Sequence, residues 1–306
     1  MPRAPLTLCC LWLSLPLGVC LAHDSPEHVI EDLTRLMERD GRSAPHLYRR
    51  ACEYRLLGRL EQAAEDLHAS IALDAAYFPA HLELGRVQLR ENRLAPALET
   101  ARRAERLVDS PAEEGRVQML QSEILLASGQ TEAALRACDA ACRAAPGEVD
   151  WRLQHSRLLG QLERHDERLA MLESAIEANP SVVLTIERVE AQLDAGLGTQ
   201  ALEEIERELA NSRWRSSWLI RRARVHRQLD EPAAARRDLR TAVAEIDRRL
   251  HPERPDAMLL LDRAHAHVLL GRMDAAAADL EHARTAGADP WRLRRLQAEM
   301  TAAQPQ

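Results

Sequence analysis

Alanine recurs at a nearly constant spacing along most of this 306-residue chain, and this spacing constrains the fold more than any other feature. The recurring position holds Arg168 once and alanine six times, at Ala63, Ala97, Ala134, Ala201, Ala235 and Ala276. The steps between the seven positions are 34, 37, 34, 33, 34 and 41 residues. A period near 34 residues is typical of stacked helix–turn–helix repeats, in which each repeat contacts only its neighbours.

A second recurring residue precedes each of these positions and is usually small. It is Ala51, Gly85, Ser122, Ser156, Val189, Ala223 or Ala264, with Val189 the bulkier exception. Small residues at matched places in two helices predict that the helices pack closely and antiparallel. The chain is rich in Ala, Leu, Arg and Glu and only 3% aromatic, which favours helices over strands.

This pattern resembles the tetratricopeptide repeat family, and Pro146 and Pro180 match the proline that ends such a repeat. The resemblance implies an all-α, right-handed superhelical solenoid of about seven helix–turn–helix repeats with flanking capping helices. We expect repeats at residues 44–77, 78–111, 115–148, 149–181, 182–215, 216–249 and 257–290. A capping helix is expected within 23–43, and a C-terminal helix and tail within 291–306.

Residues 1–22 differ from the rest of the chain and are predicted to form a secretory signal peptide. A short basic start at Arg3 precedes an apolar run from Leu6 to Leu21, which is short for a membrane span, and small residues end the segment. The alternatives are an uncleaved membrane anchor and a lipoprotein signal with its lipid on Cys20. The mature chain is therefore expected to be exported to the periplasm or secreted, with no membrane span.

Composition and spacing favour binding over chemistry. All 41 basic residues are Arg, the net charge is −7, and the acidic residues are spread along the chain, so no nucleic-acid partner is expected. Cys52, Cys138 and Cys142 remain in the mature chain, and an odd number cannot pair fully; we interpret them as small packing residues. No residue pattern indicates a catalytic, metal or cofactor site, and the chain is predicted not to be an enzyme.

In the tetratricopeptide repeat family the first helices of the repeats line a concave groove, which implies a binding surface. The residue after each small position would face this groove, which gives alternating charges over five repeats: Arg86, Glu123, Arg157, Glu190 and Arg224, followed by His265. Tyr48 and Met119 would add apolar contacts, unless they support the helix pairs from inside. The charges either grip an extended peptide through its carboxylates or neutralise one another between repeats.

The predicted function is a non-enzymatic interaction scaffold or adaptor that binds a peptide or protein segment in the groove. The family's carboxylate clamp needs Lys and Asn where this chain has Tyr48, Cys52 and Glu83, so that clamp is not expected. Two other functions stay open: a membrane-associated assembly factor for envelope protein or polysaccharide export, and an accessory subunit of an exported hydrolase.

Overall fold

The structure is a computed structural model that describes residues 25–251 and 253–303, so the expected signal peptide lies outside the described residues. The described part of the chain is all-α, with an isolated bridge between His251 and Arg254 as its one β contact. Its sixteen helices are α1 (Pro26–Asp40), α2 (Ala44–Leu56), α3 (Leu60–Leu73), α4 (Phe78–Arg90), α5 (Leu94–Glu105), α6 (Pro111–Ala127), α7 (Thr131–Ala144), α8 (Val149–Gln161), α9 (His165–Ala178), α10 (Val182–Asp194), α11 (Gly198–Asn211), α12 (Ser216–Gln228), α13 (Pro232–Arg249), α14 (Ala257–Leu269), α15 (Met273–Thr285) and α16 (Pro290–Ala303).

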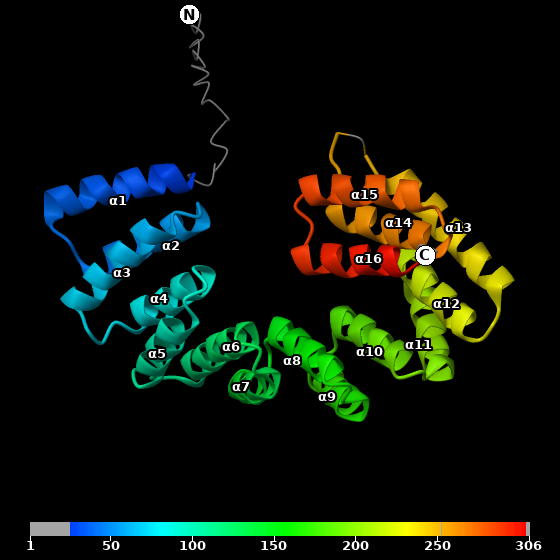
Figure 1. Ribbon diagram of the computed structural model, residues 1–306, viewed down its shortest axis with the longest axis horizontal. Coiled ribbons are helices and arrows are strands. Elements are labelled where there is room, and N and C mark those ends of the chain that lie inside the picture. Colours follow the sequence, from blue (N-terminus) through cyan, green and yellow to red (C-terminus); the bar gives the residue numbers. More distant parts are fainter. Residues whose placement is uncertain (1–24, 252, 304–306) are drawn as a thin grey trace, which may run out of the picture. The chain divides into compact units, whose positions relative to one another are not determined.

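The chain divides into two compact units, one ending at Ser128 and the other beginning at Gly129. The first contains α1 to α6 and the second α7 to α16 (Figure 1). Helices that follow one another pack as pairs within each unit, for example α2 on α3 and α12 on α13. The division falls within the range 115–148 that was predicted as one repeat. The helix that opens this range also begins earlier than predicted, at Pro111, because the Ser110 hydroxyl accepts a hydrogen bond from the Glu113 amide and caps it.

Within each unit, the recurring small residues lie where paired helices touch. All six alanines at the recurring position are at most 2% exposed. The same holds for these residues at the second recurring position: Ala51, Ser122, Ser156, Val189, Ala223 and Ala264. Gly85 of α4 shows how close the approach is, because a Cβ on it would lie 3.7 Å from Ala97 O of the paired helix α5 and 2.8 Å from Leu120 Cδ2 of α6. Close packing of this kind leaves no space for a larger side chain, so the alanine spacing reflects helix contact.

The turn between the two helices of a pair contains a residue in the left-handed backbone conformation. Glycine occupies this place four times, with φ between +72° and +74° at Gly58, Gly129, Gly196 and Gly271. The same conformation is taken by Asn92, Glu163 and Asp230, with φ of 58°, 57° and 59°. Glycine adopts it without steric cost and Asn or Asp with little, whereas Glu does so under strain.

A buried ion pair joins the two helices of four repeats, always between residues 16 apart. The arginine immediately precedes the small residue of the first helix, and the acid lies three residues after the recurring alanine. The four pairs are Arg50–Asp66, Arg188–Glu204, Arg222–Asp238 and Arg263–Asp279. In Arg222–Asp238, for example, Nε and Nη2 donate to the two carboxylate oxygens at 2.7 and 2.8 Å. Such bidentate pairs fix the rotation of the two helices of a repeat relative to each other.

Candidate functional site

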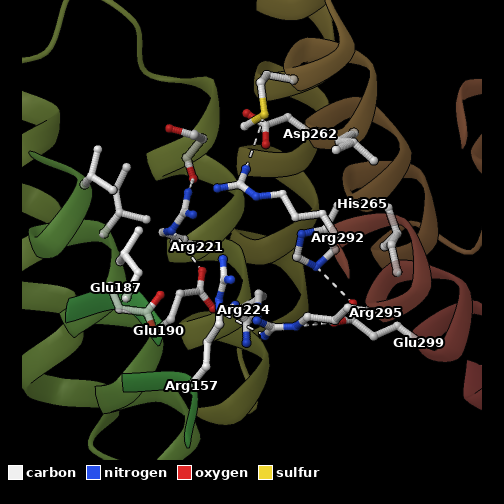
Figure 2. A pocket seen from close by; sticks show the side chains of 17 residues that line it. Arg157, Glu187, Glu190, Arg221, Arg224, Asp262, His265, Arg292, Arg295 and Glu299 are labelled. Carbon is white, nitrogen blue, oxygen red and sulfur yellow. Dashed lines mark hydrogen bonds and ion pairs between the residues drawn. The ribbon is translucent and has the colours of Figure 1, made fainter. Parts of the chain in front are cut away.

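One cavity of about 350 Å³ in the second unit brings together four of the residues predicted to face the groove. They are Arg157 on α8, Glu190 on α10, Arg224 on α12 and His265 on α14 (Figure 2). Each follows the buried small residue of its helix, so the packing that buries the small residue turns its neighbour toward the cavity. The cavity also includes side chains of α16, which lies against α14 and α15.

Glu190 is the electrostatic centre of the cavity. The side chain is buried, and its carboxylate lies 2.9 Å from Arg221 Nε and 3.6 Å from Arg295 Nη2. Arg224 Nη1 donates to the same carboxylate. Burial alone would raise the pKa of Glu190, but the three guanidinium groups outweigh it and hold that pKa well below its usual range. Glu190 is therefore ionised and holds arginines from α12 and α16.

His265 is uncharged at neutral pH although the carboxylate of Glu299 lies beside its ring. Its Nε2 lies 3.3 Å from Glu299 Oε2 of α16. The surrounding protein desolvates the ring, and the charge of Arg224 acts in the same direction, which together lower the pKa of His265 to about 3. His265 thus contributes a neutral polar ring to the cavity, and Glu299 stays available to Arg295, whose Nε lies 3.3 Å away.

The charged lining of the cavity is positive in balance. It contains five arginines, Arg157, Arg221, Arg224, Arg292 and Arg295, and four acids, Glu187, Glu190, Asp262 and Glu299. Glu187 Oε1 accepts a hydrogen bond of 2.8 Å from Arg168, which lies outside the lining. Burial raises the pKa of Asp262, against the attraction of Arg221 and Arg292. The arginines therefore exceed the acids that compensate them.

Apolar side chains make up the rest of the lining. They are Leu153, Val183, Ile186, Met258, Leu261 and Leu296. Val183 and Met258 are 48% and 45% exposed, which is high for large apolar residues. The combination of aliphatic walls with a few charged groups is the usual chemistry of a binding cavity, and the volume is in the usual range.

The predicted site residues of the first unit lie in a different setting. Arg86 Nη1 lies 3.3 Å from Glu83 Oε2 on its own helix, and the buried Glu83 also accepts a hydrogen bond from Arg55. Glu123 is exposed, whereas Met119 is buried and packs among the helices. Tyr48 is half-buried, with its ring edge-on to Tyr77. These residues belong to the first unit and do not line the cavity.

The ion pair between Arg224 and Glu190 forms one step of the predicted alternation of charge. Arg224 lies on α12 and Glu190 on α10, so this ion pair joins two successive repeats. Arg86 instead pairs with Glu83 of its own helix. Sequence reasoning missed three of the cavity arginines: Arg221, Arg292 and Arg295. Arg221 lies two residues before a small position, and Arg292 and Arg295 share a face of the predicted C-terminal helix. The shared face of Arg292 and Arg295 can be recognised in the sequence, but the helices against which α16 packs cannot.

The remaining sequence predictions concern cysteines, metals and membranes. Cys52, Cys138 and Cys142 are all free thiols, and the last two are fully buried. Among residues 25–251 and 253–303, no group of three or more His, Cys, Asp or Glu side chains is placed to hold a metal ion. Within the same residues, no helix combines the length and the apolar character that crossing a membrane requires.

Comparison with known proteins identifies the fold. No family model matches the sequence, and no curated protein is significantly similar to it. The structure is similar to a tetratricopeptide repeat protein from Parabacteroides merdae, with a TM-score of 0.56, 17% identity, and coverage of 90% of this chain and 99% of that one. Weaker likenesses include YrrB, described as a TPR protein with an unusual peptide-binding site (TM-score 0.45, 16% identity, 67% and 96% coverage). Another is TTC0263 from Thermus thermophilus (TM-score 0.41, 22% identity, 61% and 98% coverage).

Proposed function

Because the chain has the helical-repeat fold of tetratricopeptide repeat proteins, we propose that it is a non-enzymatic interaction scaffold that binds a peptide or protein segment in the cavity of the second unit. The observation that carries this proposal is the cavity itself. It is formed by the first helices of four successive pairs and α16, and combines exposed aliphatic side chains with arginines. Its volume of about 350 Å³ suits a few side chains of a bound segment.

The proposal is tested by filling the cavity without changing its charge. Val183 lines the cavity and is half exposed at the start of α10, so Val183→Trp places an indole in the cavity at little cost to the core. We expect wild-type protein to enrich a defined set of sequences from a random peptide library, and Val183→Trp to lose that enrichment. Val182→Trp is the matched control, because Val182 is 61% exposed and does not line the cavity. Equal enrichment by both variants would place binding elsewhere.

We further propose that the protein acts in an exported compartment, as the predicted signal peptide at residues 1–22 suggests. Fractionation of the producing cell and N-terminal sequencing test this proposal. A chain beginning at His23 in the exported fraction supports it, whereas a lipid on Cys20 would favour a membrane-tethered protein, and an intact Met1 in the cytoplasm would contradict export.

A further inference from the structure

The last helix forms one wall of the cavity. Arg292, Arg295, Leu296 and Glu299 of α16 all contribute to the lining, and their spacing of three, one and three residues places them on one helical face (Figure 2). Leu293 and Leu296 are buried against α14 and α15, which holds this face in position. Since α16 follows the last helix pair, part of the lining comes from outside the repeated helix pairs.

The α16 arginines carry more N–H donors than the contacts described for them use. Arg295 is 3.6 Å from the Glu190 carboxylate, farther than Arg221 at 2.9 Å, and 3.3 Å from Glu299. Arg292 Nη1 lies 3.4 Å from the thioether of Met258, which is a weak acceptor. A guanidinium group carries five N–H donors, so both side chains can accept a further anion beside these contacts.

The apolar lining determines what kind of anion fits. Leu153, Val183 and Ile186 come from α8 and α10, whereas Leu261 and Leu296 come from α14 and α16. A small hydrophilic anion would leave these aliphatic surfaces unused. A segment with a carboxylate next to an apolar side chain would use both parts of the lining, because carboxylates form two-pronged bonds with arginine while the apolar group leaves water.

We propose that the cavity is an anion site completed by α16, and that it takes an acidic protein segment in which Asp or Glu stands next to an apolar residue. Arg292 and Arg295 are then contact residues that set the preference for acidic segments. This inference rests on the proposed function, since it names the class of segment that the cavity binds. About two or three side chains of the segment fit inside, given the volume of about 350 Å³.

Labelled octapeptides of matched length test the proposal with the full chain. The probes alternate Glu with Leu, Gln with Leu, and Glu with Ser, and their binding is followed by fluorescence anisotropy. We expect the Glu–Leu peptide to bind at least about tenfold more tightly than either of the others, because only it offers both carboxylates and apolar groups. Raising the salt concentration should weaken its binding.

Substitutions in α16 separate the wall arginines from their neighbours. Arg292→Gln and Arg295→Gln should each weaken Glu–Leu binding about tenfold, because each removes a charge-assisted hydrogen bond. Arg294→Gln is the matched control on the same helix, since Arg294 is exposed and does not line the cavity. Arg292 makes a weak hydrogen bond to the Met258 thioether and attracts Asp262, but among the described residues it forms no ion pair that holds α16. Its variant therefore keeps the test valid if Arg295→Gln loosens α16.

The outcomes separate this inference from the proposed function. If the Gln–Leu peptide binds as tightly as the Glu–Leu peptide, or if Arg292→Gln and Arg295→Gln behave like Arg294→Gln, the inference is wrong although the cavity still binds segments. If none of the three peptides binds while the library still yields sequences sensitive to Val183→Trp, the inference again fails alone. If Val183→Trp changes no binding at all, the proposed function itself fails.

Discussion

Arg168 occupies a position that alanine fills in the other repeats, and its surroundings show how one residue is accommodated. It is 5% exposed, and its guanidinium group donates to Ser156 Oγ at 2.8 Å, Glu187 at 2.8 Å and Asp194 at 2.9 Å. Gly160 makes the space, because a Cβ there would lie 3.2 Å from Arg168 Nη1. The sequence marks Arg168 as an exception. In the structure, ion pairs from α9 to α10 take the place of the close alanine contact that the other repeats have.

Replacing this arginine by the residue found in the other repeats is expected to destabilise the protein. Arg168→Ala leaves an unfilled space and takes from the Glu187 carboxylate its ionic partner, which should lower the free energy of unfolding by about 3–5 kcal/mol. Chemical denaturation followed by circular dichroism measures the change. Arg164→Ala is the control, because Arg164 pairs with Glu132 and Glu167 on the surface, where solvent screens the pair, and its loss should change the free energy of unfolding little. Equal effects would contradict the buried network.

Glu163 offers a stabilising change at the residue scale. Its φ of 57° is a conformation that glycine takes in four equivalent turns. Glu163→Gly should raise the free energy of unfolding by about 0.5–1 kcal/mol. Glycine takes the left-handed conformation without strain, and this gain exceeds the extra backbone entropy that glycine loses on folding. The reverse change, Gly196→Glu, should destabilise by a similar amount. Denaturation midpoints of both variants decide the matter, and a loss of stability in Glu163→Gly would show that its side chain is needed.

The stability of the second unit should depend on pH through His265. The unfolded imidazole has a pKa of about 6.5, whereas the folded pKa is lowered to about 3. Between these values the unfolded chain binds a proton that the folded chain does not, so stability falls as the pH is lowered from 6.5 toward 3, by up to about 2 kcal/mol at pH 5. Unfolding at pH 7 and pH 5 should show a smaller loss for His265→Gln than for wild type or for His251→Gln, an exposed control. Parallel losses in all three would disprove the role of His265.

At the scale of elements, the pairs of helices are held both by small apolar contacts and by ion pairs. The apolar contacts were predictable, because alanine at a 34-residue period is visible in the sequence alone. The ion pairs were not identified, although their signal is present as an arginine before the small residue and an acid 16 residues later. A spacing of 16 residues reaches across a turn into the next helix, so no periodicity within one helix reveals it.

The ion pair between α12 and α13 should contribute more than a surface pair. In a double-mutant cycle, Arg222→Ala and Asp238→Ala are expected to show a coupling energy of about 1–3 kcal/mol, because the pair is two-pronged and largely shielded from water. Arg103 and Glu99 are the control, since they pair on the exposed face of α5 and should couple by about 0.3–0.5 kcal/mol. Unfolding of the six variants measures both cycles, and equal coupling would show that Arg222–Asp238 is merely tolerated.

The candidate site was predictable only where the repeat determines it. Arg157, Glu190, Arg224 and His265 follow from their place after the small residue of each first helix, and all four line the cavity. Arg292 and Arg295 do not follow, because α16 carries no repeat register and its position depends on packing against α14 and α15. Met119 shows the opposite case, since a residue in register is buried in the helix packing.

For the whole molecule, the division after Ser128 implies that the two units can respond separately to a local defect. Ala97→Trp should disrupt the first unit, because Ala97 is fully buried where α5 meets α4 and a large side chain cannot fit. Hydrogen exchange should then show lost protection in α3 to α6 and retained protection in α11 to α15. Ala97→Gly is the mild control. Loss of protection in both units would mean that the chain unfolds as one cooperative body.

Ion pairs whose two members lie in the same pair of helices affect how easily a whole repeat can be duplicated or deleted. A duplication or deletion of residues 216–249 carries Arg222 and Asp238 together, so neither member of this pair is left without the other. The same deletion would take Arg221 and Arg224 away from Glu190, which is a contact between neighbouring repeats. Arg168 likewise pairs across repeats, because its acids lie on α10, and a deletion of residues 182–215 would separate it from both. An ion pair within one repeat moves with that repeat, whereas an ion pair between neighbouring repeats is kept only if both repeats are inherited together.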